Sequence, residues 1–276
     1  MTLRDAVIQA VLQGLTEFLP VSSSGHLKLY QAMTGQSVEE GTFLTVILHL
    51  GTLAAVCIAF RRTLLGLFRE SGLLLRDLLT GNIRRSRMNP ERRMLLMLML
   101  STAMLIPFYW MKDVFENITL PALALCFLFT SVELFFAGRT GGNERTAGDL
   151  TVKDAVMIGL FQCAALFPGI SRSGSTVSGG LFAGLEKETA VQYSFVLGIP
   201  AILGGCIAEL SAAVQGQVSV PTGAACTGFL TAAVTGILSI RFVRLLIRSD
   251  RFHLFSVYTL CVSILTLGCW IFLKYK

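Results

Sequence analysis

The stretch that decides the fold is QGLTEFLPVSSSGH, residues 13–26. It places Gln13 and Glu17 one helical turn apart, and a proline, three serines, a glycine and a histidine follow. The surrounding chain is strongly apolar, and an ionisable group at membrane depth is costly enough to mark a functional site. We therefore expect the rest of the chain to hold this stretch beside a similar one, PGISRSGST at residues 168–176.

The composition is that of an integral membrane protein. Hydrophobic residues make up 53% and charged residues 14% of the 276 residues, and the mean hydropathy is +0.68. A soluble domain has about 25% charged residues, and apolar runs recur here at the ~20 residues needed to cross a bilayer. The net charge of +6 comes from arginine-rich loops, which indicates membrane topology and no nucleic-acid partner.

The chain repeats itself at an offset of 149 residues. Eight of the 21 positions from 5 to 25 are identical in the two copies without a gap: Asp5, Ala6, Val7, Gln13, Phe18, Ser22, Ser24 and Gly25. The copies differ where chemistry is expected, because Glu17 aligns with Leu166 and Ser23 aligns with Arg172. One copy supplies an acid and the other a cation. We therefore predict a single membrane domain, 1–276, made of repeat one (1–150) and repeat two (151–276).

Each repeat is predicted to cross the membrane three times and to carry one re-entrant pair of short helices. The re-entrant pairs are expected at 3–19 with 22–35 and at 152–167 with 172–186. The six full transmembrane helices are expected at 42–61, 92–111, 118–138, 189–210, 220–241 and 254–273. An odd number of crossings turns the second repeat upside down. The prediction is an all-α polytopic membrane protein with an inverted-topology repeat and two re-entrant helix-loop-helix regions.

Arginine and lysine set the expected orientation. Residues 61–93 carry nine arginines and residues 241–251 carry four more, and the positive-inside rule places both segments in the cytoplasm. Both termini then lie outside. Leucines alternate with Arg69 and Arg76 over 63–80, which indicates an amphipathic helix on the inner surface of the membrane.

Both loops have the features of an anion site. Each has hydroxyl-rich, glycine-containing backbone at the start of a short helix, where free N–H groups and the helix dipole attract phosphate. Arg172 suits phosphate because its planar fork donates two parallel hydrogen bonds. Glu17 would repel phosphate unless a divalent cation bridged the two, and Mg²⁺ is commonly held by one carboxylate and phosphate oxygens. Gln13 would add a neutral oxygen ligand.

The remaining polar residues of the first loop complete a hydrolytic site. His26 would serve as a general acid or base. A serine hydroxyl, of which Ser23 is the best candidate, would act as a nucleophile or orient a water molecule. The expected reaction is metal-assisted hydrolysis of a phosphate held at the membrane.

Other polar residues have simpler explanations. Ser22 and Ser171 fit helix N-caps, and Gln13 and Gln162 could simply form hydrogen bonds between helices. Glu133 is near a span end and is expected to be interfacial. His49 could equally be a helix-packing group or a pocket residue.

The two motifs resemble those of the bacterial undecaprenyl pyrophosphate phosphatase (UppP/BacA) family. Gln13-xxx-Glu17, followed by Ser-Ser-Ser-Gly-His26, is similar to the family's (Glu/Gln)-xxx-Glu and Ser-Ser-x-Gly-His motif. Residues 167–176, FPGISRSGST, are similar to its second motif, Pro-Gly-x-Ser-Arg-Ser-x-x-Thr. The resemblance covers the whole chain, in length, span order and both motifs.

The resemblance implies a hydrolase that removes the terminal phosphate of undecaprenyl pyrophosphate and regenerates the carrier lipid for peptidoglycan. It also implies a divalent cation (Mg²⁺ or Ca²⁺) and a multi-pass location in the bacterial inner (cytoplasmic) membrane. The active site would face the periplasm or cell exterior, and bacitracin would compete for the lipid substrate. A homodimer is left open.

Matched residue by residue, the resemblance implies catalytic roles for Glu17, Ser23, His26 and Arg172, with Glu17 and Gln13 at the metal. The substrate-binding residues would come from both motifs: Gln13, Ser22, Ser24, Gly25, Ser171, Ser173, Gly174 and Thr176. Gln13 stands where some members have Glu, so metal binding by residue 13 is open. The nucleophile is also open among Ser23, His26 and water.

Two alternatives compete with the phosphatase hypothesis. Inverted repeats with broken helices also describe carriers, so the chain could instead flip undecaprenyl phosphate. The acid phosphatase superfamily has a Ser-Gly-His run in membranes too, but it needs a second histidine after an arginine motif. Residues 172–209 contain no histidine, so we set that family aside.

Overall fold

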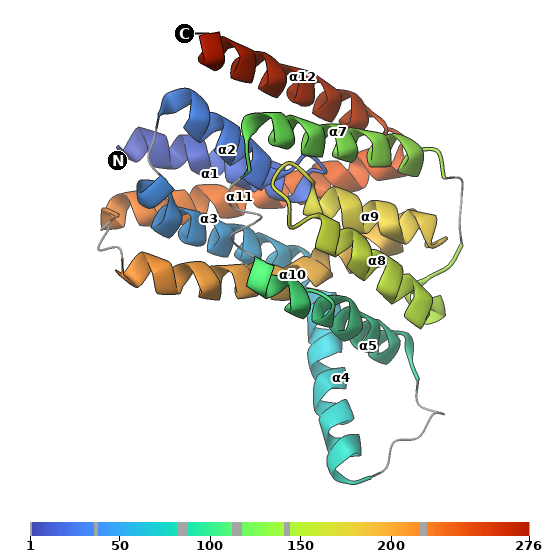
Figure 1. Cartoon of the computed structure of the whole chain (residues 1–276). Helices are drawn as coiled ribbons and strands as arrows, with labels where there is room; N and C mark the ends of the chain where they lie inside the picture. Colours follow the sequence, from blue (N-terminus) through green and yellow to red (C-terminus); the bar gives the residue numbers. More distant parts are fainter. Residues whose placement is uncertain are drawn as a thin grey trace.

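The structure is a computed structural model that describes residues 2–35, 38–81, 88–111, 118–140, 144–215 and 220–275. Arg84, Arg85 and Arg87 of the predicted cytoplasmic segment lie outside the described residues. The helices, shown in Figure 1, are α1 (Leu3–Phe18), α2 (Ser23–Thr34), α3 (Val38–Ala59), α4 (Arg61–Leu79), α5 (Pro90–Ala103), η2 (Ile106–Met111), α7 (Leu120–Ala137), η3 (Ala147–Asp149), α8 (Val152–Ala164), α9 (Arg172–Phe182), α10 (Lys187–Gln215), α11 (Thr222–Arg248) and α12 (Leu254–Tyr275).

Several of these helices are long and apolar enough to cross a membrane. Within the described residues, four pass on their own: Leu120–Ala137, Lys187–Ala208, Thr222–Arg248 and Leu254–Tyr275. A fifth span is possible where α3 continues into α4, although the two are bent by 86°. The prediction of an all-α, multi-pass membrane protein is confirmed at this level.

One predicted span, 92–111, is wrong as a continuous helix. The α-helix α5 ends at Ala103, and the 3₁₀ helix η2 follows from Ile106 to Met111. Pro107 explains the break, because proline lacks a backbone N–H and disfavours helical backbone in the residue before it. Hydropathy alone extended the span across this proline.

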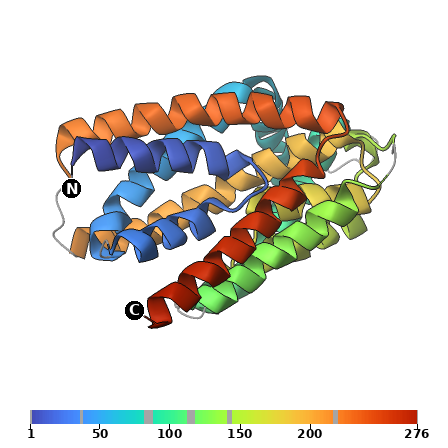
Figure 2. The ribbon, with the colours of Figure 1, turned by 90° about the horizontal axis from the view of Figure 1, so that it is seen from above.

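The two pairs of short helices lie where the sequence predicts them. The helices have 16 and 12 residues in the first pair and 13 and 11 in the second. At 1.5 Å per residue each is about 16–24 Å long, which is less than the ~30 Å of the hydrocarbon core. The α1–α2 pair enters the bundle from the end that holds both termini, and the α8–α9 pair enters from the opposite end (Figures 1 and 2).

Equivalent side chains cap the helices of both pairs. Thr2 begins α1 and Thr151 begins α8, each with a reciprocal capping box. Ser22 and Ser171 cap α2 and α9, and each hydroxyl accepts the N–H three residues later, at 3.3 Å and 3.1 Å. Each pair of equivalent caps is 149 residues apart, the offset of the sequence repeat. The predicted N-caps at Ser22 and Ser171 are confirmed.

Helices from the two halves of the sequence pack against one another. Helix α1 of the first half packs along α11 of the second half, and α8 of the second half packs along α5 of the first half. Gly14 permits the first of these contacts, because a β-carbon there would overlap the Thr235 hydroxyl and lie 2.7 Å from the Ala232 carbonyl. Small residues at helix crossings allow such close approach in membrane proteins. Residues of both halves therefore share one core.

A buried polar cluster fixes α4 to the start of α5. Arg92 donates through Nε to Glu70 at 3.2 Å and through Nη1 to Asp77 at 2.7 Å. Asn89 Nδ2 donates to the other oxygen of Glu70 at 2.8 Å. The three charged side chains are buried, so the ion pairs and hydrogen bonds between them must compensate for the hydration that each charge has lost.

We predict that Arg92→Met destabilises the protein strongly. It leaves two buried carboxylates without their cation, which costs about 3 kcal/mol or more and should lower the thermal midpoint by roughly 5–10 °C. Thermal unfolding of the purified protein in detergent measures this shift. Arg69→Gln is the matched control, because Arg69 lies on the exposed side of α4. Equal midpoints for the two variants would show that the cluster does not hold α4.

Candidate functional site

The loops of the two short-helix pairs meet in the middle of the bundle. The Gly169 N–H donates to the Ser22 hydroxyl at 3.0 Å, and the Ser173 hydroxyl donates to the Leu19 carbonyl at 3.1 Å. Gly169 has a φ of +94°, which glycine adopts without strain. Thr130 of α7 supports the turn by donating to the Gly169 carbonyl and accepting a backbone N–H of the same loop, both at 3.0 Å.

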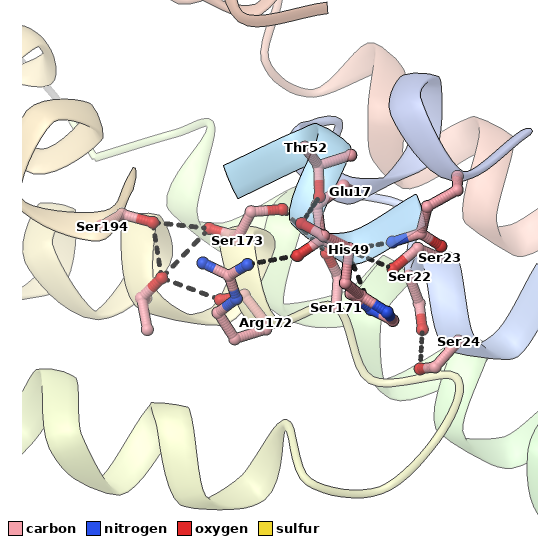
Figure 3. Close-up of polar contacts among 12 residues, drawn as sticks. Glu17, Ser22, Ser23, Ser24, His49, Thr52, Ser171, Arg172, Ser173 and Ser194 are labelled. Carbon is pink, nitrogen blue, oxygen red and sulfur yellow. Dashed lines mark hydrogen bonds and ion pairs between the residues drawn. The ribbon is translucent and has the colours of Figure 1, made fainter. Parts of the chain in front are cut away.

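Glu17 lies at this meeting point and receives donors from both halves. Its Oε1 accepts from Arg172 Nη2 in a direct ion pair, as Figure 3 shows. Its Oε2 accepts from Gln13 Nε2 at 2.9 Å and from the Ser23 hydroxyl at 2.8 Å. Glu17 is buried. The acid of one repeat and the cation of the other therefore share one site.

Arg172 is the first residue of α9, and its guanidinium lies against α10. A β-carbon on Gly198 of α10 would overlap Arg172 Nη1, so only glycine leaves room for the guanidinium in this position. Nη1 is buried, and within the described residues it has no hydrogen-bond partner. The guanidinium thus has a donor beyond those that Glu17 uses.

A polar cavity of about 250 Å³ opens beside the ion pair. Both loops line it: Thr16, Glu17, Ser22, Ser23, Ser24, Ala165, Ile170, Ser171 and Arg172. That volume includes space open to solvent, so the cavity suits a small polar group and not a whole lipid. Ser22, Ser24 and Ser171, predicted to bind substrate, lie in its wall.

Two predicted substrate-binding hydroxyls hold the protein together instead. Ser173 bonds the Leu19 carbonyl, as described, and Thr176 donates to the Arg172 carbonyl at 2.8 Å and contacts the Ser194 hydroxyl at 2.6 Å. Neither is among the residues that line the cavity. Their contacts fix the first turn of α9, which carries Arg172.

The two predicted glycines serve the contact between the loops. A β-carbon on Gly25 would lie 2.9 Å from the Gly169 backbone, and one on Gly174 would lie 3.1 Å from the Pro20 β-carbon. The four positions form two pairs related by the 149-residue offset. The glycines let the loops approach; they do not line the cavity.

His26 lies outside the cavity wall. Its Nδ1 donates to the Ser22 carbonyl at 2.7 Å, and its Nε2 lies 2.9 Å from the Tyr258 hydroxyl. The two rings stack with centroids 5.8 Å apart. Its role as a general acid or base stays a prediction.

His49 of α3 is a third ionisable group at the site. Its Nε2 lies 3.9 Å from Glu17 Oε2, and its Nδ1 donates to the Thr45 carbonyl at 2.9 Å. His49 therefore lies beside the carboxylate of the site, although it is not among the residues that line the cavity. A lone histidine inside an apolar span was the signal available.

The prediction that Glu133 is interfacial is wrong. Glu133 is buried and accepts the Ser175 hydroxyl of α9 at 2.7 Å. Its other oxygen is buried and has no hydrogen-bond partner in the described part of the chain. Because α7 is covered by both α9 and α12, a residue near its end lies inside the protein. Together with Thr130, one turn earlier, it holds α9 in place.

Glu17 and Gln13 fit a divalent cation only if a phosphate binds with it. The Oε1 of Gln13 is buried and has no partner within the described residues, so a neutral oxygen is available next to the carboxylate. No group of three or more His, Cys, Asp or Glu residues in the described ranges could hold a metal ion. One carboxylate and one amide oxygen suit Mg²⁺ when phosphate oxygens and water supply the other ligands.

Comparison with known proteins places the chain in a family. The family model described as bacitracin resistance protein BacA matches residues 6–265. An undecaprenyl-diphosphatase of Alkaliphilus metalliredigens is 37% identical over 271 residues, which cover 95% of this chain and 97% of that protein. An undecaprenyl-diphosphatase of Rubrobacter xylanophilus is 38% identical over 278 residues (97% and 100%), and one of Korarchaeum cryptofilum is 36% identical over 273 residues (97% and 99%). The chain belongs to the BacA family.

Proposed function

We propose that this protein is a membrane-embedded phosphatase that hydrolyses undecaprenyl pyrophosphate to undecaprenyl phosphate and inorganic phosphate. The observation that carries the proposal is the Glu17–Arg172 pair, which joins the two loops beside a small cavity lined by polar side chains. The relatives are named for this hydrolysis, and their names favour it over the flipping of undecaprenyl phosphate. Competition by bacitracin and the homodimer stay predictions.

The proposal includes the inverted-topology repeat of 1–150 and 151–276 in one membrane domain. Equivalent caps at an offset of 149 residues, and short-helix pairs that enter from opposite ends, support it (Figure 1). The two loops would then meet within an inner bacterial membrane, each as a re-entrant pair. With the arginine-rich segment in the cytoplasm, the first pair and the cavity would face the periplasm.

Ser23 is the proposed nucleophile, because it is a hydroxyl already bonded to a carboxylate. Its Oγ donates to Glu17 at 2.8 Å, the arrangement of a nucleophile beside its base. In the proposed reaction Ser23 Oγ attacks the terminal phosphorus while Glu17 takes its proton. The bond from phosphorus to the bridging oxygen breaks, and undecaprenyl phosphate leaves with that electron pair. Water then cleaves the phosphoserine, which releases inorganic phosphate and restores the hydroxyl.

Arg172 links substrate binding to the activation of Ser23. In the structure its guanidinium partly neutralises Glu17 and so makes the carboxylate a weaker base. A phosphate in the cavity would compete for the guanidinium, because the bidentate fork matches phosphate oxygens. Glu17 would then be free to accept the Ser23 proton, and Arg172 would stabilise the charge that develops on the phosphoryl group.

A divalent cation, Mg²⁺ or Ca²⁺, is part of the proposal. The unpartnered oxygen of Gln13 and the Glu17 oxygen that Arg172 gives up would hold it together with the substrate, and the other Glu17 oxygen would stay with Ser23. When bound, it would offset the repulsion between the carboxylate and the phosphate and polarise the phosphoryl oxygens.

We predict that the purified protein releases phosphate from undecaprenyl pyrophosphate and that Ser23→Ala removes this activity. Loss of the nucleophile should lower kcat by roughly 10³-fold or more, and excess EDTA should lower the rate of the unchanged protein by about 100-fold or more. Phosphate release in detergent, with and without Mg²⁺, measures both effects. Ser249→Ala, a serine in the α11–α12 connection, is the control.

Each arm of this experiment has a contrary outcome. Near-normal turnover by Ser23→Ala would leave His26 or water as the nucleophile. Full activity in excess EDTA would remove the cation from the account. Absence of phosphate release, with lipid translocation by the same protein in vesicles, would favour the carrier.

We further predict that Gly198→Ala impairs activity by displacing Arg172. The added methyl group overlaps the guanidinium, so Arg172 must leave Glu17, and kcat/KM should fall about 100-fold. Gly204→Ala on the same helix is the matched control, because nothing lies within 4 Å of a β-carbon there. The thermal midpoint checks that both variants fold. Equal kcat/KM for the two variants would contradict the role of this packing.

A further inference from the structure

Helix α4 is nearly perpendicular to α3, the helix that precedes it. It is bent by 86° from α3, whose apolar sequence suits a span, and in Figure 1 it projects away from the bundle at a steep angle to the long helices α10 and α11. A helix perpendicular to a span lies parallel to the membrane plane. The buried Arg92 cluster fixes α4 in this direction, so its orientation is part of the fold.

The charges of α4 are separated between two sides. Both acids of the helix, Glu70 and Asp77, face inward and are buried against Arg92. All of its arginines are exposed: Arg61, Arg62, Arg69 and Arg76. The outward side of α4 therefore carries positive charge with no acid of the same helix to neutralise it.

An apolar stripe follows the same outward side. Its members are strongly exposed: Leu65 (69%), Phe68 (77%), Leu75 (58%), Leu78 (55%) and Leu79 (80%). Their spacings of three (65 to 68, 75 to 78), four (75 to 79) and seven (68 to 75) residues place them on one face of a helix. Arg62, Arg69 and Arg76 are seven residues apart and so form a row beside this stripe. An apolar stripe bordered by arginines is typical of a helix that lies in the interface of a bilayer.

We propose that α4 lies flat on one surface of the membrane and binds anionic phospholipid head groups through this arginine row. The apolar stripe would enter the boundary between head groups and acyl chains, and the guanidinium groups would contact phosphates at the same depth. Charge complementarity favours an anionic lipid surface, because basic residues beside a membrane are attracted to anionic head groups. This interaction is separate from the proposed hydrolysis.

Tryptophan quenching by brominated lipids tests the proposal. Phe68→Trp is made in a protein whose own tryptophans are replaced (Trp110→Phe and Trp270→Phe) and is reconstituted into phosphatidylcholine vesicles with or without phosphatidylglycerol. Bromine on the acyl chains should quench the new tryptophan, and phosphatidylglycerol should increase the quenching at low salt by about twofold or more. Changing Arg62, Arg69 and Arg76 together to Gln should abolish that increase. Arg251→Gln, an exposed arginine of another loop, should not.

Three outcomes would overturn the proposal. A tryptophan that is quenched by aqueous iodide and not by bromine would place α4 in water. Bromine quenching that ignores both phosphatidylglycerol and the arginine changes would mean apolar insertion without head-group binding. Protection from both quenchers, with cross-linking between copies of the chain, would mean that a second copy covers the stripe. The thermal midpoint of each variant shows that it is folded.

Discussion

The ion pair between Glu17 and Arg172 is the constraint on which the rest of the structure depends. A carboxylate or a guanidinium alone at this depth is costly, and each becomes tolerable only beside the other. The two charges belong to different halves of the sequence, so the pair can form only if both loops reach one point. The hydrogen bonds of Ser22 to Gly169 and of Ser173 to Leu19 hold them there.

The same pair explains how a resting site can be stable and still reactive. Without substrate, Glu17 is fully occupied by Arg172, Gln13 and Ser23, and no charge lacks a partner in this contact. In the proposed mechanism an anionic phosphate would compete for Arg172, and its arrival would change the state of the carboxylate that holds Ser23. Substrate binding and activation of the nucleophile would then be two results of one exchange of partners.

Much of this arrangement could be predicted from the sequence, because local rules govern it. Proline, glycine and capping serines fix the ends of α2 and α9, and the 149-residue offset assigns the acid to one loop and the cation to the other. Positions that depend on packing between distant helices were harder. His49 approaches Glu17 because α3 packs against α1, and Glu133 is buried because α7 packs against both α9 and α12. The histidine inside an apolar span was a signal for His49, but nothing along the chain identified Glu17 as its neighbour, and no pattern marked Glu133 as buried. By contrast, the end of α5 could have been predicted from Pro107, but the predicted span followed hydropathy alone and continued past this proline.

The most direct test of the account is whether the two loops touch in the membrane. A β-carbon at position 174 would lie 3.1 Å from that of Pro20, a few tenths of an ångström below the ~3.5–4.5 Å of a disulfide, so a small shift of the loops would let two cysteines pair. In a protein with its own cysteines replaced, Pro20→Cys with Gly174→Cys should form an intramolecular disulfide under mild oxidation in membranes. Protease cleavage between the repeats should then leave the fragments linked until a reductant is added. Fragments that separate without reductant would contradict the convergence of the loops, and with it the shared site.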